Sequence, residues 1–285
     1  MRLRTLPVSI AGVFTAAGYA LLGPGLDLAP VALCLLFAVL CQIASNFANE
    51  YYDFRAGLDR PGRVGPRRGV TEGDITPGAM ARATFATLGA ACLVGLSLIY
   101  WGGWWLVFVG LFIAVGVLAY SSGPYPLSRH GLGEVAVVFF FGVVPVLFTY
   151  YLSGGSLGDT KVILGSFALG LMGANVLIVN NYRDILDDRE VGKRTLAVIL
   201  GRERISDLYL INGFLAVLLL LPTYHAAAPW AWIAPAVYIA AHVALYFALC
   251  RRSGPALNPL LGMTAMNMLL YSLLFLASAL LLSDF

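Results

Sequence analysis

Long apolar runs, separated by shorter polar stretches, dominate the pattern of hydrophobic and polar positions along this chain. The runs are continuous rather than alternating, which favours helices over strands. Several approach the roughly 20 residues that a helix needs to cross the hydrocarbon core of a bilayer. We therefore expect an all-α membrane protein, built as one integral-membrane domain over residues 1–285. The predicted spans are residues 7–23, 29–52, 79–100, 103–121, 134–152, 162–182, 205–222, 229–249 and 260–282.

Composition agrees with a chain that faces lipid. Hydrophobic residues make up 60% of it and charged residues only 12%, where a soluble domain carries about 25% charged residues. The cysteines Cys34, Cys41, Cys92 and Cys250 fall inside apolar runs without metal-ligand spacing, so we expect no redox or metal role for them. The first apolar run follows Arg2 and Arg4 without a clear cleavage site, and is interpreted as a span.

The basic residues indicate how the chain is oriented. Of the 18 Lys and Arg residues, only Lys161 lies on the side opposite Arg2 and Arg4. Positive residues in short loops mark the cytoplasmic side, so the N-terminus is predicted inside and the C-terminus outside. Frequent Arg, Ala and Gly suggest a GC-rich bacterial genome, and hence the inner (plasma) membrane. The net charge of +3 is modest, so a lipid bilayer is the expected partner and a nucleic acid is not.

Two clusters of Asn and Asp stand where the second and sixth spans end, each before a long charged loop. Within each cluster the residues are spaced i, i+3 and i+7, which places them on one face of a helix. Polar groups at membrane depth are costly and usually face a cavity or a partner. The pattern predicts one composite site at the cytoplasmic face. The members are Asn46, Asn49 and Asp53 in the first cluster, and Asn181, Asp184 and Asp188 in the second.

The carboxylates of these clusters are candidate magnesium ligands. Asp59 follows Asp53 after Gly57, a residue that lets the chain turn back. Converging carboxylates repel each other unless a cation lies between them, and hard oxygen ligands suit Mg²⁺, which shares its coordination with substrate phosphates. Glu50 and Asp187 lie nearby. The predicted metal ligands are Asn49, Asp53, Asp59, Asp184 and Asp188, and Asn181 completes the catalytic set.

Basic residues beside the acids indicate a ligand that is anionic and bridged by metal. A diphosphate fits, because metal ions take some of its oxygens and Arg or Lys donors take others. Glu134, the only acid near residues 122–133, is interpreted as a helix-start charge. The candidate diphosphate-binding residues are Arg63, Arg67, Arg68, Lys193, Arg194 and Asn46.

Both clusters resemble the two aspartate-rich motifs of the UbiA superfamily of intramembrane prenyltransferases. The resemblance covers most of the chain, and within the family it is greatest to the branch that prenylates 1,4-dihydroxy-2-naphthoate in menaquinone synthesis. One departure is Glu50, where the family's first motif would have Asp. Because the Glu side chain is longer, the resemblance does not assign Glu50 a direct role as a metal ligand. The matching stretches are Asn46–Asp59, Arg63–Gly69, Arg129–Glu134, and Asn180–Leu196 with Gly192 and Thr195.

The resemblance implies helices around a central chamber, cytoplasmic cap loops, and a magnesium-dependent aromatic prenyltransferase. Polyprenyl diphosphate would bind through Mg²⁺, its tail would lie among the helices, and the allylic cation would be attacked by an aromatic carbon. The naphthoate would lose its carboxyl group, giving demethylmenaquinol. Prenyl length, the proton-accepting base and oligomeric state stay open. Candidate contacts to the cation or the acceptor are Tyr120, Tyr125, Arg129 and Tyr182.

Two other functions remain as alternatives. One is prenylation of another acceptor, such as 4-hydroxybenzoate or homogentisate, against which the pattern over residues 49–69 argues. The other is an ion transporter that uses the same carboxylates. Transporter sites tend to lie near the bilayer midplane on broken helices, whereas these acids stand at the ends of spans before long loops. The placement favours an enzyme.

Overall fold

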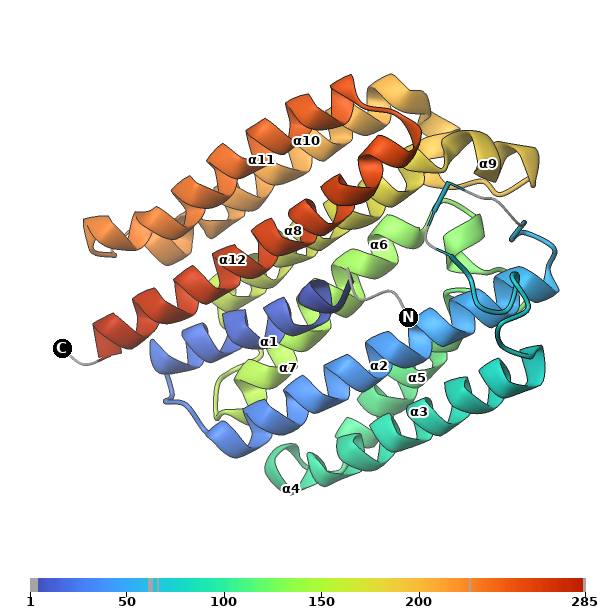
Figure 1. The fold of residues 1–285 in the computed structure, drawn as a ribbon. Helices are drawn as coiled ribbons and strands as arrows, with labels where there is room; N and C mark the ends of the chain where they lie inside the picture. The colour runs from blue at the N-terminus through green and yellow to red at the C-terminus, as the bar shows by residue number, and fades with distance from the viewer. Residues whose placement is uncertain (1–4, 61–63, 66, 226, 284–285) are drawn as a thin grey trace.

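The computed structural model describes residues 5–60, 64–65, 67–225 and 227–283, and within these ranges the regular elements are all helices (Figure 1). The prediction of an all-α chain is confirmed. In chain order the elements are α1 (Leu6–Leu21), α2 (Leu28–Arg55), α3 (Pro77–Ser97), α4 (Ile99–Gly102), α5 (Leu106–Ala119), η2 (Leu127–Arg129), α6 (Gly133–Val137), η3 (Val138–Val143), α7 (Val144–Leu152), α8 (Thr160–Arg183), α9 (Ile185–Glu190), α10 (Leu196–Tyr224), η4 (Pro229–Trp232), α11 (Ile233–Arg251), η5 (Gly254–Leu257) and α12 (Asn258–Ser283).

The helices occupy the predicted spans. Seven helical stretches in the described part of the chain are long and apolar enough to cross a membrane. Four of these are composite: α3 with α4, α6 through α7, η4 with α11, and η5 with α12. Two shorter apolar helices, α1 and α5, fill the remaining predicted spans. This is a multi-pass membrane protein.

The helices form two groups that meet along α1 (Figure 1). Helices α8, α10, α11 and α12 pack on one another, and α2, α3 and α5 form a second group. Helix α1 contacts α2, α7 and α12, and so joins the two groups. The two long charged loops, with α9 inside the second, lie at the same end of the bundle, whereas α12 ends at the opposite end (Figure 1).

Several of these helices have a side chain that caps their first turn. Thr76 accepts a hydrogen bond from the Ala79 amide at the start of α3, and Asp159 does the same for Lys161 at the start of α8. Such caps satisfy amides that the helix itself leaves without acceptors. Helix α10 begins at Leu196, earlier than the predicted 205, but Gly201 interrupts it with φ +78° and ψ 171°. Glycine adopts this backbone conformation without the clash that a Cβ would cause.

A close contact between backbones joins η3 to α8. Residues Val138–Val143 form a π-helical segment, which the apolar pattern did not predict. A Cβ on Gly142 would overlap the carbonyl oxygen of Ser166 and the backbone of Gly170 in α8. Small residues permit such close packing between helices in membranes. The contact sets the position of α8, which carries the start of the second Asn/Asp cluster.

Helix α5 is short and faces outward. It has 14 residues, and large apolar side chains on it are exposed. These are Phe108, Leu111, Phe112 and Val115.

Candidate functional site

The first Asn/Asp cluster lies along one buried face of α2, as its spacing predicts. Helix α2 continues to Arg55 and carries Asn46, Asn49 and Asp53, all of them buried. Asn49 donates to the Ser121 hydroxyl at 3.0 Å. The polar face therefore points into the bundle at the end that carries the long loops.

Arg68 folds back from the first loop onto this cluster. Its Nη2 donates to Asn49 Oδ1 at 2.9 Å and lies 3.6 Å from Asp53 Oδ2, while its Nε lies 3.3 Å from Asp59 Oδ2. The side chain is only 3% exposed. A planar guanidinium can contact several acceptors at once, so Arg68 holds Asn49, Asp53 and Asp59 together.

Arg129 contacts the other side of Asp53. Its Nη2 lies 3.3 Å from Asp53 Oδ1 and also donates to the carbonyl oxygens of Tyr52 and Ser121, at 3.2 and 3.0 Å. The buried Asp53 carboxylate thus lies between two guanidinium groups. Arg129 was expected to contact the cation or the acceptor, and the structure places it on the first cluster instead.

The departure at Glu50 has a structural explanation. Glu50 is buried, and its Oε1 accepts a hydrogen bond from the Val70 amide at 3.0 Å. The extra methylene of Glu relative to Asp lets the carboxylate reach the backbone of the first loop. Because Val70 follows Arg68 closely in sequence, this bond holds the segment that places Arg68.

The second cluster does not follow one continuous helix, so that part of the spacing argument was wrong. Helix α8 ends at Arg183, and Asp184 separates it from α9 with φ −93° and ψ 8°. Arg183 donates to both Asp184 oxygens at 2.7 Å, and also to Asn180 and Asn258. Asp184, 2% exposed, is therefore held by its neighbour on the chain.

Carboxylates from both clusters meet at one acidic cavity of about 710 Å³, open side included. It is lined by Asp53, Asp59, Asp187 and Asp188, with Lys193 among the basic residues. Lys193 Nζ lies 3.7 Å from Asp188 Oδ1. Asp184 is not in this lining, whereas Asp187, which was not among the predicted metal ligands, is. Among the described residues, no group of three or more His, Cys, Asp or Glu side chains is close enough together to hold a metal ion as it stands.

A second, polar cavity of about 430 Å³, open side included, lies beside the acidic one and shares Lys193 with it. Asn49, Arg68 and Asn181 also line it. So does Glu134, which is 6% exposed and whose Oε1 accepts a hydrogen bond from Asn181 at 2.8 Å. The sequence analysis treated Glu134 as a helix-start charge. A carboxylate at the first turn of an apolar span was the signal that could have identified it.

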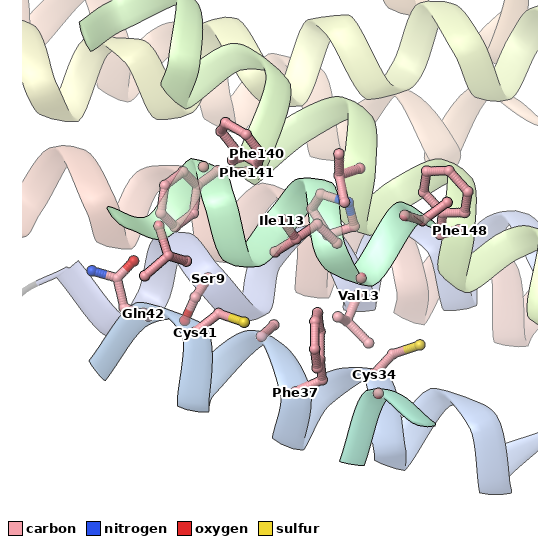
Figure 2. A pocket seen from close by; sticks show the side chains of 18 of the residues that line it. Ser9, Val13, Cys34, Phe37, Cys41, Gln42, Ile113, Phe140, Phe141 and Phe148 are labelled. Atoms are coloured by element: carbon pink, nitrogen blue, oxygen red, sulfur yellow. The ribbon is translucent and has the colours of Figure 1, made fainter. Parts of the chain in front are cut away.

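A third cavity is apolar and larger, about 1050 Å³ with its open side included. Figure 2 shows its aromatic lining, in which Phe37 of α2 lies opposite Phe140, Phe141 and Phe148 of the η3–α7 stretch. A fourth cavity, lined by Asn46, Asn49 and Asn180 among others, lies between the polar and apolar ones. Tyr120 lines the polar, the apolar and the fourth cavity.

Three other predicted residues, Arg67, Arg194 and Tyr125, do not line these cavities. Arg67 is exposed and pairs with Asp74 at 2.8 Å, and Arg194 is exposed. Tyr125 is exposed and stacks on His130, with ring centroids 3.8 Å apart. Arg63 lies outside the described residues.

Tyr182 faces a different part of the bundle. Its ring is buried, and the Arg202 guanidinium lies 5.1 Å from the ring centroid. Tyr182 does not line any of the four cavities described above, and its contact with a substrate cation stays a prediction. The contact between Tyr182 and Arg202 could not be predicted from the sequence, because the direction of a side chain near a helix end depends on where the helix stops.

Comparison with known proteins connects this arrangement to one family. The model of the UbiA prenyltransferase family matches residues 11–268. The chain is 35% identical over 288 residues to 1,4-dihydroxy-2-naphthoate octaprenyltransferase of Escherichia coli, covering 96% of this chain and 92% of that protein. The protein of the same name from Mycobacterium tuberculosis is 36% identical over 279 residues, with 95% and 92% covered.

Solved structures share the fold. A UbiA homolog from Aeropyrum pernix K1 superposes with a TM-score of 0.74 at 15% identity and covers 100% of both chains. A UbiA homolog from Archaeoglobus fulgidus, bound to DMAPP and Mg²⁺, gives a TM-score of 0.68 at 18% identity and covers 99% of this chain and 98% of that one. With the family match over residues 11–268, these comparisons confirm the resemblance: the chain belongs to the UbiA prenyltransferase family.

Proposed function

We propose that this protein transfers a polyprenyl group from polyprenyl diphosphate to 1,4-dihydroxy-2-naphthoate with loss of the carboxyl group, giving demethylmenaquinol for menaquinone synthesis. The observation that carries the proposal is the meeting of an apolar and a polar cavity at Tyr120, beside an acidic one. The apolar cavity matches a prenyl tail, the polar cavity an aromatic acid, and the acidic cavity a metal-bound diphosphate. The names of the bacterial relatives support the choice of acceptor.

The acidic cavity suits magnesium. Asp53, Asp59 and Asp188 offer oxygen ligands from three parts of the chain, and Asp187 lies beside them. We propose these residues as the ones that would hold Mg²⁺. Asn49 and Asp184, the other expected ligands, are held here by Arg68 and Arg183. Bound metal would stabilise negative charge on the leaving diphosphate.

The chain's own residues supply the rest of the chemistry. Arg68, Arg129 and Lys193 place positive charge around the acids and suit the remaining diphosphate oxygens. The apolar cavity would hold the tail and exclude water from the allylic cation. Tyr120, at the junction, would face that cation with an electron-rich ring. The acceptor ring would enter from the polar cavity.

Location follows from the same arrangement. We propose that the protein lies in the inner (plasma) membrane of a bacterium, with the end that carries both long loops in the cytoplasm. The basic residues of those loops support this orientation. The N-terminus would then be cytoplasmic and the C-terminus outside.

A direct assay tests the function. The purified protein is incubated with Mg²⁺, labelled polyprenyl diphosphate and one acceptor at a time, and products are identified by mass. The expected result is a prenylated, decarboxylated naphthol with release of diphosphate. Product from 4-hydroxybenzoate or homogentisate alone would assign another branch. Bound substrates without any product, together with cation flux in liposomes, would favour the transporter alternative.

Glu50 provides a first prediction within this site. If its role is to accept the Val70 amide, Glu50→Gln keeps an acceptor oxygen and should retain turnover within about threefold of wild type. Glu50→Ala removes the acceptor and leaves a buried amide unsatisfied, which should destabilise the loop by about 1–3 kcal/mol. Turnover and limited proteolysis of residues 67–76 would be measured for both variants. Loss of turnover in Glu50→Gln as large as in Glu50→Ala would instead indicate that the charge is needed.

A further inference from the structure

The polar cavity contains two buried oxygens that no described residue hydrogen-bonds. One is Glu134 Oε2 and the other is the Ser128 hydroxyl. Buried polar atoms nearly always have partners, so two such atoms in one cavity indicate that a ligand completes them. Glu134 is the stronger acceptor, and Asn181 already holds its other oxygen at 2.8 Å. The Asn181 bond occupies Oε1 and leaves Oε2 as the carboxylate oxygen without a partner among the described residues.

The proposed acceptor carries a group that needs such a partner. In 1,4-dihydroxy-2-naphthoate, the hydroxyl next to the carboxylate donates its hydrogen to that carboxylate within the molecule. The hydroxyl at position 4 has no hydrogen-bond acceptor beside it on the ring. Its acceptor would therefore come from the protein. The substrate carboxylate would find positive charge in the same cavity from Lys193, which lines the acidic cavity as well.

We propose that Glu134 is a specificity-determining residue that binds the position-4 hydroxyl of the aromatic acceptor through Oε2, an inference that rests on the proposed function. The residue then selects acceptors that carry a hydroxyl at that position of the ring. Asn181 acts as a positioning residue for Glu134. Its place at the end of α8 connects acceptor selection to the second cluster.

The test compares two ligands that differ only in this hydroxyl. Equilibrium binding of 1,4-dihydroxy-2-naphthoate and 1-hydroxy-2-naphthoate is measured on the full chain in detergent with Mg²⁺. A hydrogen bond to a charged group corresponds to about 10- to 100-fold in affinity, so wild type should prefer the dihydroxy ligand by that factor. Glu134→Gln keeps the bond from Asn181 and should reduce the preference to the roughly 2- to 10-fold of a neutral hydrogen bond. Glu134→Met, which removes both oxygens, should reduce it to about one.

A matched control and a second readout separate this role from a structural one. Glu72→Gln makes the same charge change at an exposed position of the first loop and should keep the wild-type preference. Affinity for polyprenyl diphosphate should stay within about threefold in every variant, since the change lies in the acceptor cavity. A merely structural role would lower the affinity for both naphthoates equally and leave their ratio unchanged.

The outcomes are distinct. Wild-type preference retained in both Glu134 variants, or no preference in wild type, overturns the role of Glu134 while prenylation of the naphthoate continues to support the proposed function. Failure of wild type to bind or prenylate 1,4-dihydroxy-2-naphthoate, with turnover of another acceptor, overturns the proposed function itself and this inference with it.

Discussion

Replacing Asp53 with asparagine should lower kcat by about 10²- to 10³-fold, the size of effect seen when one electrostatic group of a preorganised site is removed. Asp53 is 2% exposed and lines the acidic cavity. Asparagine keeps the shape but removes the negative charge, so a metal would lose one anionic ligand. Turnover at saturating substrates, and the magnesium concentration needed for half-maximal rate, would both be measured.

The fold should survive this change because the partners of Asp53 have other contacts. Arg129 also donates to the carbonyl oxygens of Tyr52 and Ser121, and Arg68 lies beside Asp59. Neither guanidinium is left as an unpaired buried charge, the situation that strongly destabilises a protein. Asp74→Asn is the matched control, since Asp74 pairs only at the surface with Arg67. Equal turnover in the Asp53 variant and wild type would remove Asp53 from the catalytic set.

Adding one methyl group at Gly142 should lower the stability of the helix bundle. In Gly142→Ala, the new Cβ would overlap the backbone of α8 at Ser166 and Gly170. A backbone has no other rotamer to adopt, so η3 and α8 must move apart. Overpacking of this kind costs about 1–3 kcal/mol. Thermal unfolding in a single detergent would show a lower Tm, and turnover should fall as well because α8 carries Asn181.

Gly89→Ala provides the comparison within the same chain. Gly89 lies exposed in α3, and a Cβ there would meet nothing within 4 Å. Alanine favours helix over glycine by roughly 1 kcal/mol, so this variant should have an unchanged or slightly higher Tm. A Gly142→Ala protein as stable as Gly89→Ala would show that the contact between η3 and α8 is not close.

The sequence predicted the parts of this molecule that depend on local periodicity. Apolar runs gave the spans, and the spacing of Asn46, Asn49 and Asp53 gave their common face, because α2 is regular to Arg55. The same spacing failed over Asn181–Asp188, because the chain stops being helical at Asp184. Such a break depends on tertiary contacts, here the hydrogen bond from Arg183 to Asn258, which no spacing rule contains.

Contacts between residues far apart in the sequence could not be predicted either. Arg68 was one of several basic residues in its loop, and only the folded chain distinguishes it from the exposed Arg67. Glu134 and Asn181 are separated by 47 positions yet form one hydrogen bond. The π-helical turns of η3 have no signature in an apolar run, since every residue there would suit an α-helix equally well.

The shortness of α5 has a consequence for the surrounding lipid. Fourteen residues rise about 21 Å along a helix axis, at roughly 1.5 Å each, whereas the hydrocarbon core is about 30 Å thick. The exposed Phe108, Leu111, Phe112 and Val115 cover only that shorter height, so acyl chains beside α5 are expected to tilt or compress to meet it. Because α5 is also a wall of the apolar cavity, the proposed prenyl tail would lie next to this locally thinned bilayer.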